Sequence, residues 1–354
     1  MPSRSYPRLR RILAVASLFI LIGPTPLGTM TQPKPVTDQV VRAVKLAWPQ
    51  GASTGKDGKG RVGALTFVEG WQLDSNYSLF GGFSGIAMIG PRRFLLVGDT
   101  GLVTGFTLYP DGRVMRPFIA PLPEGPGKKG EKSARDAEAL TATPDGSHYW
   151  IGFEQFHSIY RFGPSLVTDE AHSFPKAFKG LWNNGGIEAL ARLGDGRFVA
   201  IAEDQEKTGP NVGKAGVAAW LFQGDPTEVP DQVMAFRYDA EGKGKVTDVQ
   251  QLPDGRLILL HRDVGPIAGF VSTVAIADMA NIGPGGMMTS RTIARIEAPA
   301  LADNFEGMAV VTEGPDWFIW MVSDDNLMGF QRSMVIKYKI DRGLIPAPGP
   351  GFGG

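Results

Sequence analysis

One short pattern recurs five times along the chain, and it constrains the fold more than any other feature of the sequence. Each copy begins with an acidic or hydroxyl residue and opens a short strand-like run. After a turn, a second apolar run follows and ends at or near an acid. The copies begin at Ser84, Glu138, Glu188, Asp248 and Glu306. Successive copies lie roughly 50 to 60 residues apart. Short strands at such a period are typical of the blades of a β-propeller.

The turns between the two runs support hairpins. Three of them are Asp-Gly turns, at Pro144-Asp145-Gly146, Gly194-Asp195-Gly196 and Pro253-Asp254-Gly255. Tight hairpins need residues that tolerate a positive φ, and Asp-Gly supplies them. The sequence therefore predicts an all-β propeller with five visible repeats, which allows five or six blades.

The last repeat has one strand fewer than the others. Its strand-like runs are Gly307–Val311, Phe318–Val322 and Met334–Ile340, after which the chain nears its end. An incomplete blade would leave an unpaired edge. We therefore predict that an N-terminal strand at Gly63–Val68 completes the last blade and closes the ring.

The chain divides into four segments on composition. Arginines followed by the apolar run Ile12–Ile22 predict an export signal or N-terminal anchor over 1–30, because the run is short for a transmembrane helix. We expect a linker over 31–60 with a helical turn or two around Asp38–Leu46, the propeller over 61–341, and a flexible Pro/Gly tail over 342–354. The expected location is periplasmic or secreted, with tethering to the inner membrane if the signal is not cleaved.

Composition excludes several functions. The chain has no cysteine, so disulfides, thiolate metal sites and cysteine nucleophiles are excluded. Its 36 basic and 36 acidic residues leave no net charge, which argues against nucleic acid as the main partner. We expect a monomer whose partner is a small-molecule ester, with membrane contact only through an uncleaved N-terminal segment.

Acidic residues recur at positions that a propeller would bring together. The first strand of each blade lines the central channel, so Glu138, Glu188, Asp248 and Glu306 should converge on one axis. The acids that close the second strands form an equivalent set: Asp99, Glu154, Glu203, Asp204, Asp263, Asp324 and Asp325. Gathered carboxylates repel one another unless a cation compensates them. Either a hard cation, with Ca²⁺ the usual choice for oxygen ligands, or arginines should lie among them.

Two further observations bear on that cation. The densest cluster of oxygen ligands is Asp324-Asp325-Asn326, which lacks the full pattern of an EF-hand loop. The candidate arginines are Arg135, Arg161, Arg262 and Arg332. The alternative interpretation is that these acids cap strands or face solvent.

Several segments together resemble the bacterial phytase-like family, which carries the description "esterase-like activity of phytase". They are Phe80–Ile86, Ala134–Leu140, Gly186–Leu190, Asn304–Ala309, Val322–Asn326 and Gln331-Arg332. The resemblance covers roughly residues 61–341. It implies an exported β-propeller hydrolase that acts on phosphate or carboxylic esters with calcium.

The leading hypothesis is thus an ester hydrolase with Ca²⁺ in the propeller channel. Its metal ligands would be Glu138, Glu188, Glu306, Asp324 and Asp325, and the metal would position and polarise a water. Glu188 and Glu306 are also assigned to catalysis, and Arg135, Arg161 and Arg332 would neutralise the charge that develops on the ester oxygens. Two alternatives stay open: a non-catalytic ligand-binding or scaffold propeller, and a lactonase-type sugar hydrolase.

Overall fold

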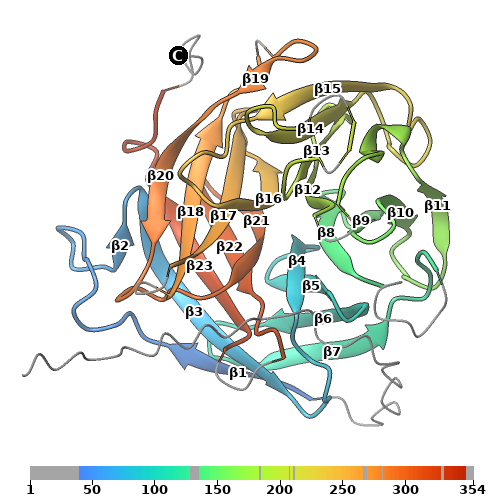
Figure 1. The fold of residues 1–354 in the computed structure, drawn as a ribbon. Helices are drawn as coiled ribbons and strands as arrows, with labels where there is room; N and C mark the ends of the chain where they lie inside the picture. The colour runs from blue at the N-terminus through green and yellow to red at the C-terminus, as the bar shows by residue number, and fades with distance from the viewer. Residues whose placement is uncertain are drawn as a thin grey trace, which may run out of the picture.

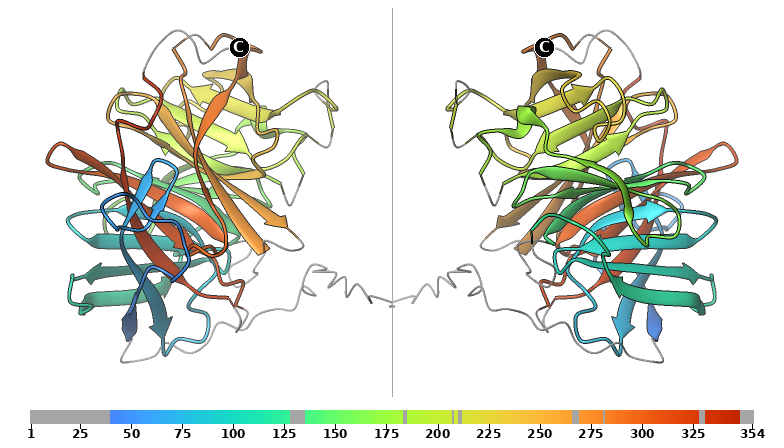
Figure 2. Two further views of the ribbon diagram at one scale, coloured as in Figure 1. Left: turned by 90° about the vertical axis from the view of Figure 1, so that its left-hand side faces the viewer. Right: turned by 90° about the vertical axis from the view of Figure 1, so that its right-hand side faces the viewer.

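Five sheets, antiparallel except for one short strand, surround a central axis in the computed structural model (Figure 1). The structure describes residues 40–127, 135–182, 185–206, 208–209, 212–265, 269–280, 282–327 and 331–347. Apart from a 3-10 helix at Lys176–Phe178, every regular element in these ranges is a strand. Side views show the strands without a covering layer of helices (Figure 2).

The first four sheets follow one another along the chain. Blade 1 contains β4 (Phe83–Met88), β5 (Arg93–Gly98), β6 (Leu102–Leu108) and β7 (Val114–Pro121). Blade 2 contains β8 (Ala137–Ala142), β9 (Tyr149–Phe153), β10 (Ser158–Phe162) and β11 (Asp169–Ser173). Blade 3 contains β12 (Ile187–Arg192), β13 (Phe198–Ala202), β14 (Val217–Phe222) and β15 (Val233–Tyr238), with β19 (Met287–Met288) parallel to β15. Blade 4 contains β16 (Lys245–Gln251), β17 (Leu257–Gly265), β18 (Gly269–Ala277) and β20 (Ser290–Ile296).

Blade 5 combines the two ends of the propeller. Its strands are β21 (Phe305–Glu313), β22 (Asp316–Ser323), β23 (Met334–Ile340), β3 (Leu65–Ser75) and β1 (Val41–Leu46), and β2 (Arg61–Val62) pairs with β3. Strand β3 pairs antiparallel with β23, so that Leu65 lies opposite Ile340 and Trp71 opposite Val335. The predicted closure by an N-terminal strand is confirmed.

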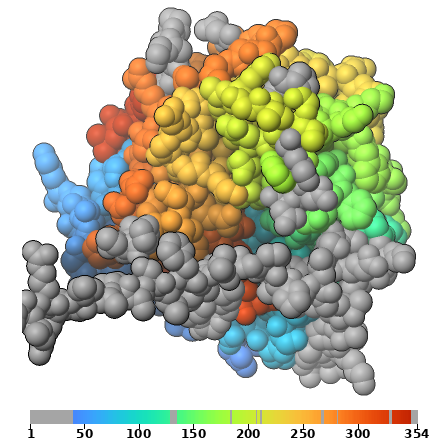
Figure 3. All heavy atoms as spheres, viewed as in Figure 1, coloured from blue at the N-terminus to red at the C-terminus, as the bar shows by residue number. Residues whose placement is uncertain are grey.

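The innermost strands are β4, β8, β12, β16 and β21, and each contacts the next around the ring, with β21 returning to β4 (Figure 1). The predicted propeller is confirmed, and it has five blades. The space-filling view shows the blades following one another around the molecule in chain order (Figure 3).

Aromatic side chains hold neighbouring blades together. Phe94 of blade 1 meets Trp320 of blade 5 edge to face, with ring centroids 4.9 Å apart. Trp150 of blade 2 meets Phe198 of blade 3 in the same way, also at 4.9 Å. Such pairs add to the stability that comes from burial of large apolar area. The hydrophobic core thus lies between the sheets and leaves the axis to polar residues at one mouth.

The segment before the propeller differs from the prediction. The helical turn expected around Asp38–Leu46 is wrong for Val41–Leu46, which forms the edge strand β1 and pairs with β3 from Ser75 to Gly70. The free edge of β3 offers a ladder of hydrogen bonds, and tertiary pairing outweighs weak local preference. Asp38 and the predicted export signal at 1–30 lie outside the described residues.

The start of the predicted flexible tail is also packed. Ile345 lies against the core between blades 4 and 5, and the Pro346 carbonyl accepts a hydrogen bond of 2.6 Å from Arg256 Nη1. Residues 348–354 lie outside the described residues. Within the described ranges, no helix is long and apolar enough to cross a membrane.

Candidate functional site at the acidic mouth

Each innermost strand carries a β-bulge at the same place. The ladder to the second strand skips one residue in every blade, for example between Ile187 and Ala189 in β12. A bulge of this kind re-aims the extra side chain. The five bulged residues, which we call the bulge ring, are Ser84, Glu138, Glu188, Thr247 and Glu306.

A second ring follows from the same register. In each blade, the residue before the bulge pairs with a residue near the end of the second strand. The residue that follows this partner in the chain belongs to what we call the end ring. The end ring consists of Asp99, Glu154, Glu203, Arg262 and Asp324. In four blades the backbone N–H of the end-ring residue donates to the carbonyl two residues before the bulge, as from Glu154 to Asp136 at 3.0 Å. The two rings together define the acidic mouth of the channel.

Blade 4 corrects the prediction for Asp248 and Asp263. Its bulged residue is Thr247 and its end-ring residue is Arg262, so both predicted acids are one position out of register. The Asp248 carboxylate instead accepts hydrogen bonds from Met308 N–H at 2.6 Å and Val249 N–H at 2.7 Å. It therefore joins blade 4 to blade 5. The Asp263 carboxylate accepts a hydrogen bond from Val264 N–H at 2.8 Å, in an exposed position.

The position after the bulge explains this shift. In the other blades it is a glycine or alanine, because the neighbouring blade comes close: a Cβ at Gly307 would lie 3.0 Å from the Ser84 carbonyl oxygen. In blade 4 the position is Asp248. The Asp248 side chain fits at this position because its carboxylate accepts a hydrogen bond from the backbone of the neighbouring blade.

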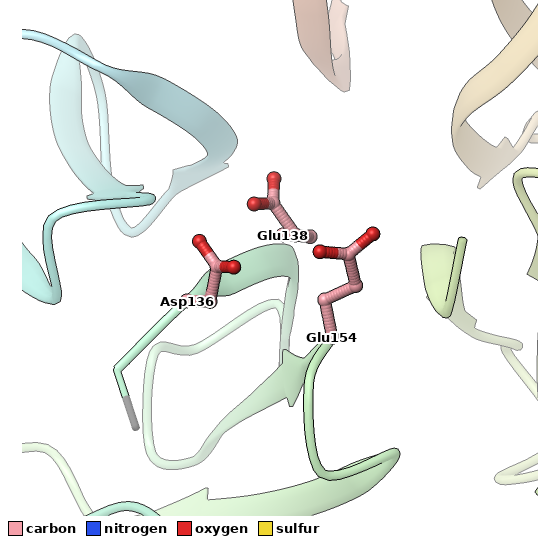
Figure 4. A group of neighbouring side chains, drawn as sticks. All are labelled: Asp136, Glu138 and Glu154. Atoms are coloured by element: carbon pink, nitrogen blue, oxygen red, sulfur yellow. The ribbon is translucent and has the colours of Figure 1, made fainter. Parts of the chain in front are cut away.

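Carboxylates of blades 2 and 3 form two overlapping groups. Oxygens of Asp136, Glu138 and Glu154 lie within 4.8 Å of one another, and so do oxygens of Glu154, Glu188 and Glu203. Figure 4 shows the three carboxyl groups of the first set turned toward one another. Glu154 belongs to both groups. These oxygens are close enough to share a cation.

Burial and mutual repulsion shift these carboxyls. Burial, with Asp136 and Glu203 nearby, raises the pKa of Glu154 to about 8. Burial and the charges of Glu203 and Glu154 raise the pKa of Glu188 well above its usual range. Burial and Glu188 have the same effect on the pKa of Glu138. Without a cation, the group is therefore most stable when it is partly protonated.

Blade 4 supplies the compensating charge. Arg262 donates through Nη1 to Glu306 Oε1 and, at 3.1 Å, to Asn304 Oδ1, while its Nη2 lies 3.3 Å from Glu203 Oε1. The carboxylate of Glu306 holds the pKa of Arg262 above its usual range, so the guanidinium stays charged. Lys245 Nζ lies 3.0 Å from Glu203 Oε2. Burial alone would lower the pKa of Lys245, but Glu203 reverses this and raises it.

Blade 5 links the two predicted acids through an amide. Asn304 Nδ2 donates to Glu306 Oε1 at 2.8 Å and to Asp324 Oδ2 at 3.1 Å. Burial and the charge of Glu306 raise the pKa of Asp324 well above its usual range. In Glu306, burial raises the pKa in spite of the opposing effect of Arg262. Both predicted residues therefore lie in the mouth, and Arg262 links Glu306 to Glu203 of blade 3.

Three other predicted residues lie at the rim and not in the rings. The Asp325 carboxylate accepts from Gly82 N–H at 3.0 Å and from Ser333 Oγ at 2.8 Å, which ties blade 1 to blade 5. Asn326 Nδ2 donates to Gln331 Oε1 in an exposed turn. Asp204 is half-exposed, 3.7 Å from Lys245 Nζ.

The three arginines assigned to catalysis lie elsewhere. Arg161 is on β10 toward the outside of blade 2, where it bonds Asp225 and Glu228 at 2.6 Å. Arg135 is buried before β8 and donates to the Pro126 carbonyl at 2.9 Å. Arg332 lies beside the mouth, with Nε 3.4 Å from Asp303 Oδ2.

Sequence reasoning missed Asp136, Lys245 and Asn304, and it left Arg262 as one arginine among four. All four residues follow from the bulge register. The sequence marks this register by an apolar residue two positions after the bulge. In blades 2, 3 and 5 this residue is Leu140, Leu190 and Met308. Aligning blade 4 on Val249 instead of on its acid places Thr247 in the bulge ring.

A family model described as "Phytase-like: Esterase-like activity of phytase" matches residues 78–327. A search of curated proteins finds no match. Among solved structures, the WD40 β-propeller domain of Doa1 is similar at 13% identity over 75% of this chain and 96% of that one, with a TM-score of 0.37. This last likeness is too distant to bear on the site.

Proposed function

The chain belongs to the phytase-like family, which supports a hydrolase-type propeller, and we propose that it is an exported, calcium-dependent hydrolase of phosphate or carboxylic esters. One observation carries the proposal. Two overlapping groups of three carboxylates in blades 2 and 3 share Glu154 and lie next to the cations of blade 4.

The donor set fits calcium. Every candidate ligand is a carboxylate oxygen, and Ca²⁺ takes oxygen ligands at about 2.3–2.6 Å. Two ligands on opposite sides of such an ion lie about 5 Å apart, and the oxygens of each group lie within 4.8 Å of one another. Asp136, Glu138, Glu154, Glu188 and Glu203 would hold the ion. Glu306, Asp324 and Asp325, the other ligands expected from the sequence, belong to neither group of three.

When bound, calcium supplies Lewis-acid polarisation of an ester oxygen or of a water. Glu188 belongs to one carboxylate group and lies near Glu138 of the other and near Arg262, so it would orient the water and accept its proton. Binding of the ion would favour the ionised form of this carboxyl, which burial otherwise keeps protonated.

Arg262 and Lys245 take the role that the sequence assigned to other arginines. Their positive charges lie at the edge of the carboxylate groups, where they would neutralise the negative charge that develops on the ester oxygens. Export remains part of the proposal because its support is the basic and apolar composition of residues 1–30.

The test is ester hydrolysis by the purified full chain. We expect release of 4-nitrophenol from 4-nitrophenyl phosphate or 4-nitrophenyl acetate in Ca²⁺, and none after chelation. Glu188→Ala should abolish release without unfolding the protein, whereas Asp263→Ala, at the exposed position in blade 4, should leave it unchanged. Turnover of a lactone alone would identify the lactonase alternative. Calcium-dependent stability with no turnover of any of these substrates would identify the scaffold alternative.

A further inference from the structure

The opposite mouth of the channel has its own ring of side chains. At this mouth, the end of each innermost strand pairs with the beginning of the second strand of the same blade. In blade 3, for example, Arg192 pairs with Phe198. We call these residues the opposite ring: Met88, Ala142, Arg192, Gln251 and Val311. All five line one hollow of about 710 Å³. Its volume is that of a small-molecule site.

The walls of this hollow combine polar and apolar side chains. Met88, Val310 and Val311 of blades 1 and 5 expose apolar surface to it, with the buried side chains of Ile86, Leu140 and Trp320 beneath. Val310 and Met88 are only half-buried, so apolar surface stays within reach of solvent. A concave apolar surface of this kind takes the non-polar body of a ligand.

Arg192 is the charged residue without a counter-ion in this hollow. The other charged side chains that line it are paired: Arg92 with Glu69 at 2.7 Å, and Glu313 with Lys337 at 2.5 Å. Among the residues that the structure describes, no carboxylate forms an ion pair with Arg192. Its Nη1 has only a long contact of 3.4 Å with the Leu193 carbonyl.

The strand holds Arg192 in place at this position. Its backbone N–H donates to Thr141 Oγ1 of blade 2 at 3.1 Å, and Gly194 N–H donates to Gln251 Oε1 of blade 4 at 2.7 Å. The end of β12 is thus fixed on both sides. The backbone of Arg192 is therefore fixed at the hollow, and its planar guanidinium presents its donors to an anion in a set geometry.

We infer that the opposite mouth binds a small amphiphilic anion, with a carboxylate on Arg192 and an apolar body against the hollow. A guanidinium can donate two parallel hydrogen bonds to a carboxylate. The site lies at the other end of the innermost strands from the carboxylate rings, and it contains no calcium ligand set. Its occupancy should therefore be independent of calcium and of the hydrolytic activity.

The test is calorimetric titration of the full chain with octanoate, in the presence of chelator. We expect saturable binding with a stoichiometry of one. Octan-1-ol, which keeps the apolar body, and octylammonium, which reverses the charge, should each bind at least about tenfold more weakly, as expected for loss of a charge-assisted hydrogen bond. Equal binding of all three probes would show that Arg192 selects nothing and would overturn the inference.

Variants separate this site from its surroundings. Arg192→Gln should weaken octanoate binding about tenfold or more, to the level of octan-1-ol. Arg197→Gln is the matched control, because Arg197 lies in the same blade, half-exposed and paired with Asp195 outside the hollow; it should bind octanoate as the unmodified chain does. Glu188→Ala should also bind octanoate normally. If Arg192→Gln keeps full affinity, or if binding is lost in Glu188→Ala, the ligand lies elsewhere.

Discussion

The two mouths of this propeller are built by the same five strands but carry opposite chemistry. At the acidic mouth, bulges turn Glu138, Glu188 and Glu306 toward the axis, and acids close four of the five second strands. At the opposite mouth, the opposite ring consists of Met88, Ala142, Gln251, Val311 and one charged member, Arg192. The backbone therefore sets only where side chains meet, and the residues at each level decide what they can bind.

A second contrast lies inside the acidic mouth. Blades 2 and 3 contribute only carboxylates to the rings, whereas blade 4 contributes Thr247 and Arg262, with Lys245 beside them. A symmetric ring of acids would repel itself. The break in symmetry at blade 4 provides a cation and leaves the proposed calcium ligands to blades 2 and 3.

The largest effect should come from a carboxylate of the acidic mouth. Glu188→Ala should reduce ester hydrolysis at least about 100-fold, because it removes both an oxygen ligand and the group that orients water. Met88→Leu at the opposite ring should leave the rate unchanged. The rate of 4-nitrophenol release measures both. Equal losses in the two variants would mean that the mouths do not differ in catalysis.

Replacing Arg262 at the acidic mouth should affect stability more than replacing Arg192 at the opposite mouth. Arg262→Gln leaves buried carboxylates uncompensated, and we expect the free energy of unfolding to fall by about 3 kcal/mol in chelator. Arg192→Gln removes an unpaired surface-facing charge and should change it by less than about 0.5 kcal/mol. Urea unfolding measures both values. Saturating calcium should restore part of the lost free energy of unfolding in Arg262→Gln and should have no such effect on Arg192→Gln.

Without calcium, the stability of the fold should decrease as the pH rises, because carboxyl groups of the acidic mouth have raised pKa values. Glu154 keeps its proton up to about pH 8 when folded but loses it near 4.5 when unfolded. In chelator, its contribution is fully present below 4.5 and is lost as the pH rises through 8. Calcium should offset this loss, by about 2.7 kcal/mol at a hundred times its dissociation constant. Melting temperatures at pH 5 and 8 test this. A larger calcium effect at pH 5 would contradict it.

The smallest effect tests the register of blade 4. Asp248→Asn should lower the free energy of unfolding by about 1–2 kcal/mol, because one of its backbone hydrogen bonds to Met308 or Val249 weakens. Calcium affinity should not change. A loss of calcium affinity in this variant would show that Asp248 belongs to the calcium site, as the sequence pattern predicted.

The fold was predictable because repeats and turns are local signals. The recurring pattern and the Asp-Gly turns gave the blades, and the missing strand of the last repeat pointed to closure by Gly63–Val68. The edge strand β1 was not predictable, since Val41–Leu46 becomes a strand only through the free edge of β3.

The site was predictable only in part, for a geometric reason. Glu138, Glu188 and Glu306 share a register that the sequence shows, but in blade 4 the bulge falls on Thr247, and the acid, Asp248, lies one residue later. Arg262 lies near the end of the second strand of blade 4, in the mouth, whereas Arg161 lies on the third strand of blade 2, toward the outside. Their positions depend on strand order, which only the assembled sheet defines.

Calcium titration of the full chain and of Glu154→Gln tests the central claim most directly, because Glu154 belongs to both carboxylate groups. Isothermal calorimetry should show saturable calcium binding by the unmodified chain. The affinity should fall at least about tenfold in Glu154→Gln, as expected for loss of an oxygen ligand. Absence of binding to the unmodified chain, or equal affinity in the two proteins, would contradict a calcium centre at the acidic mouth.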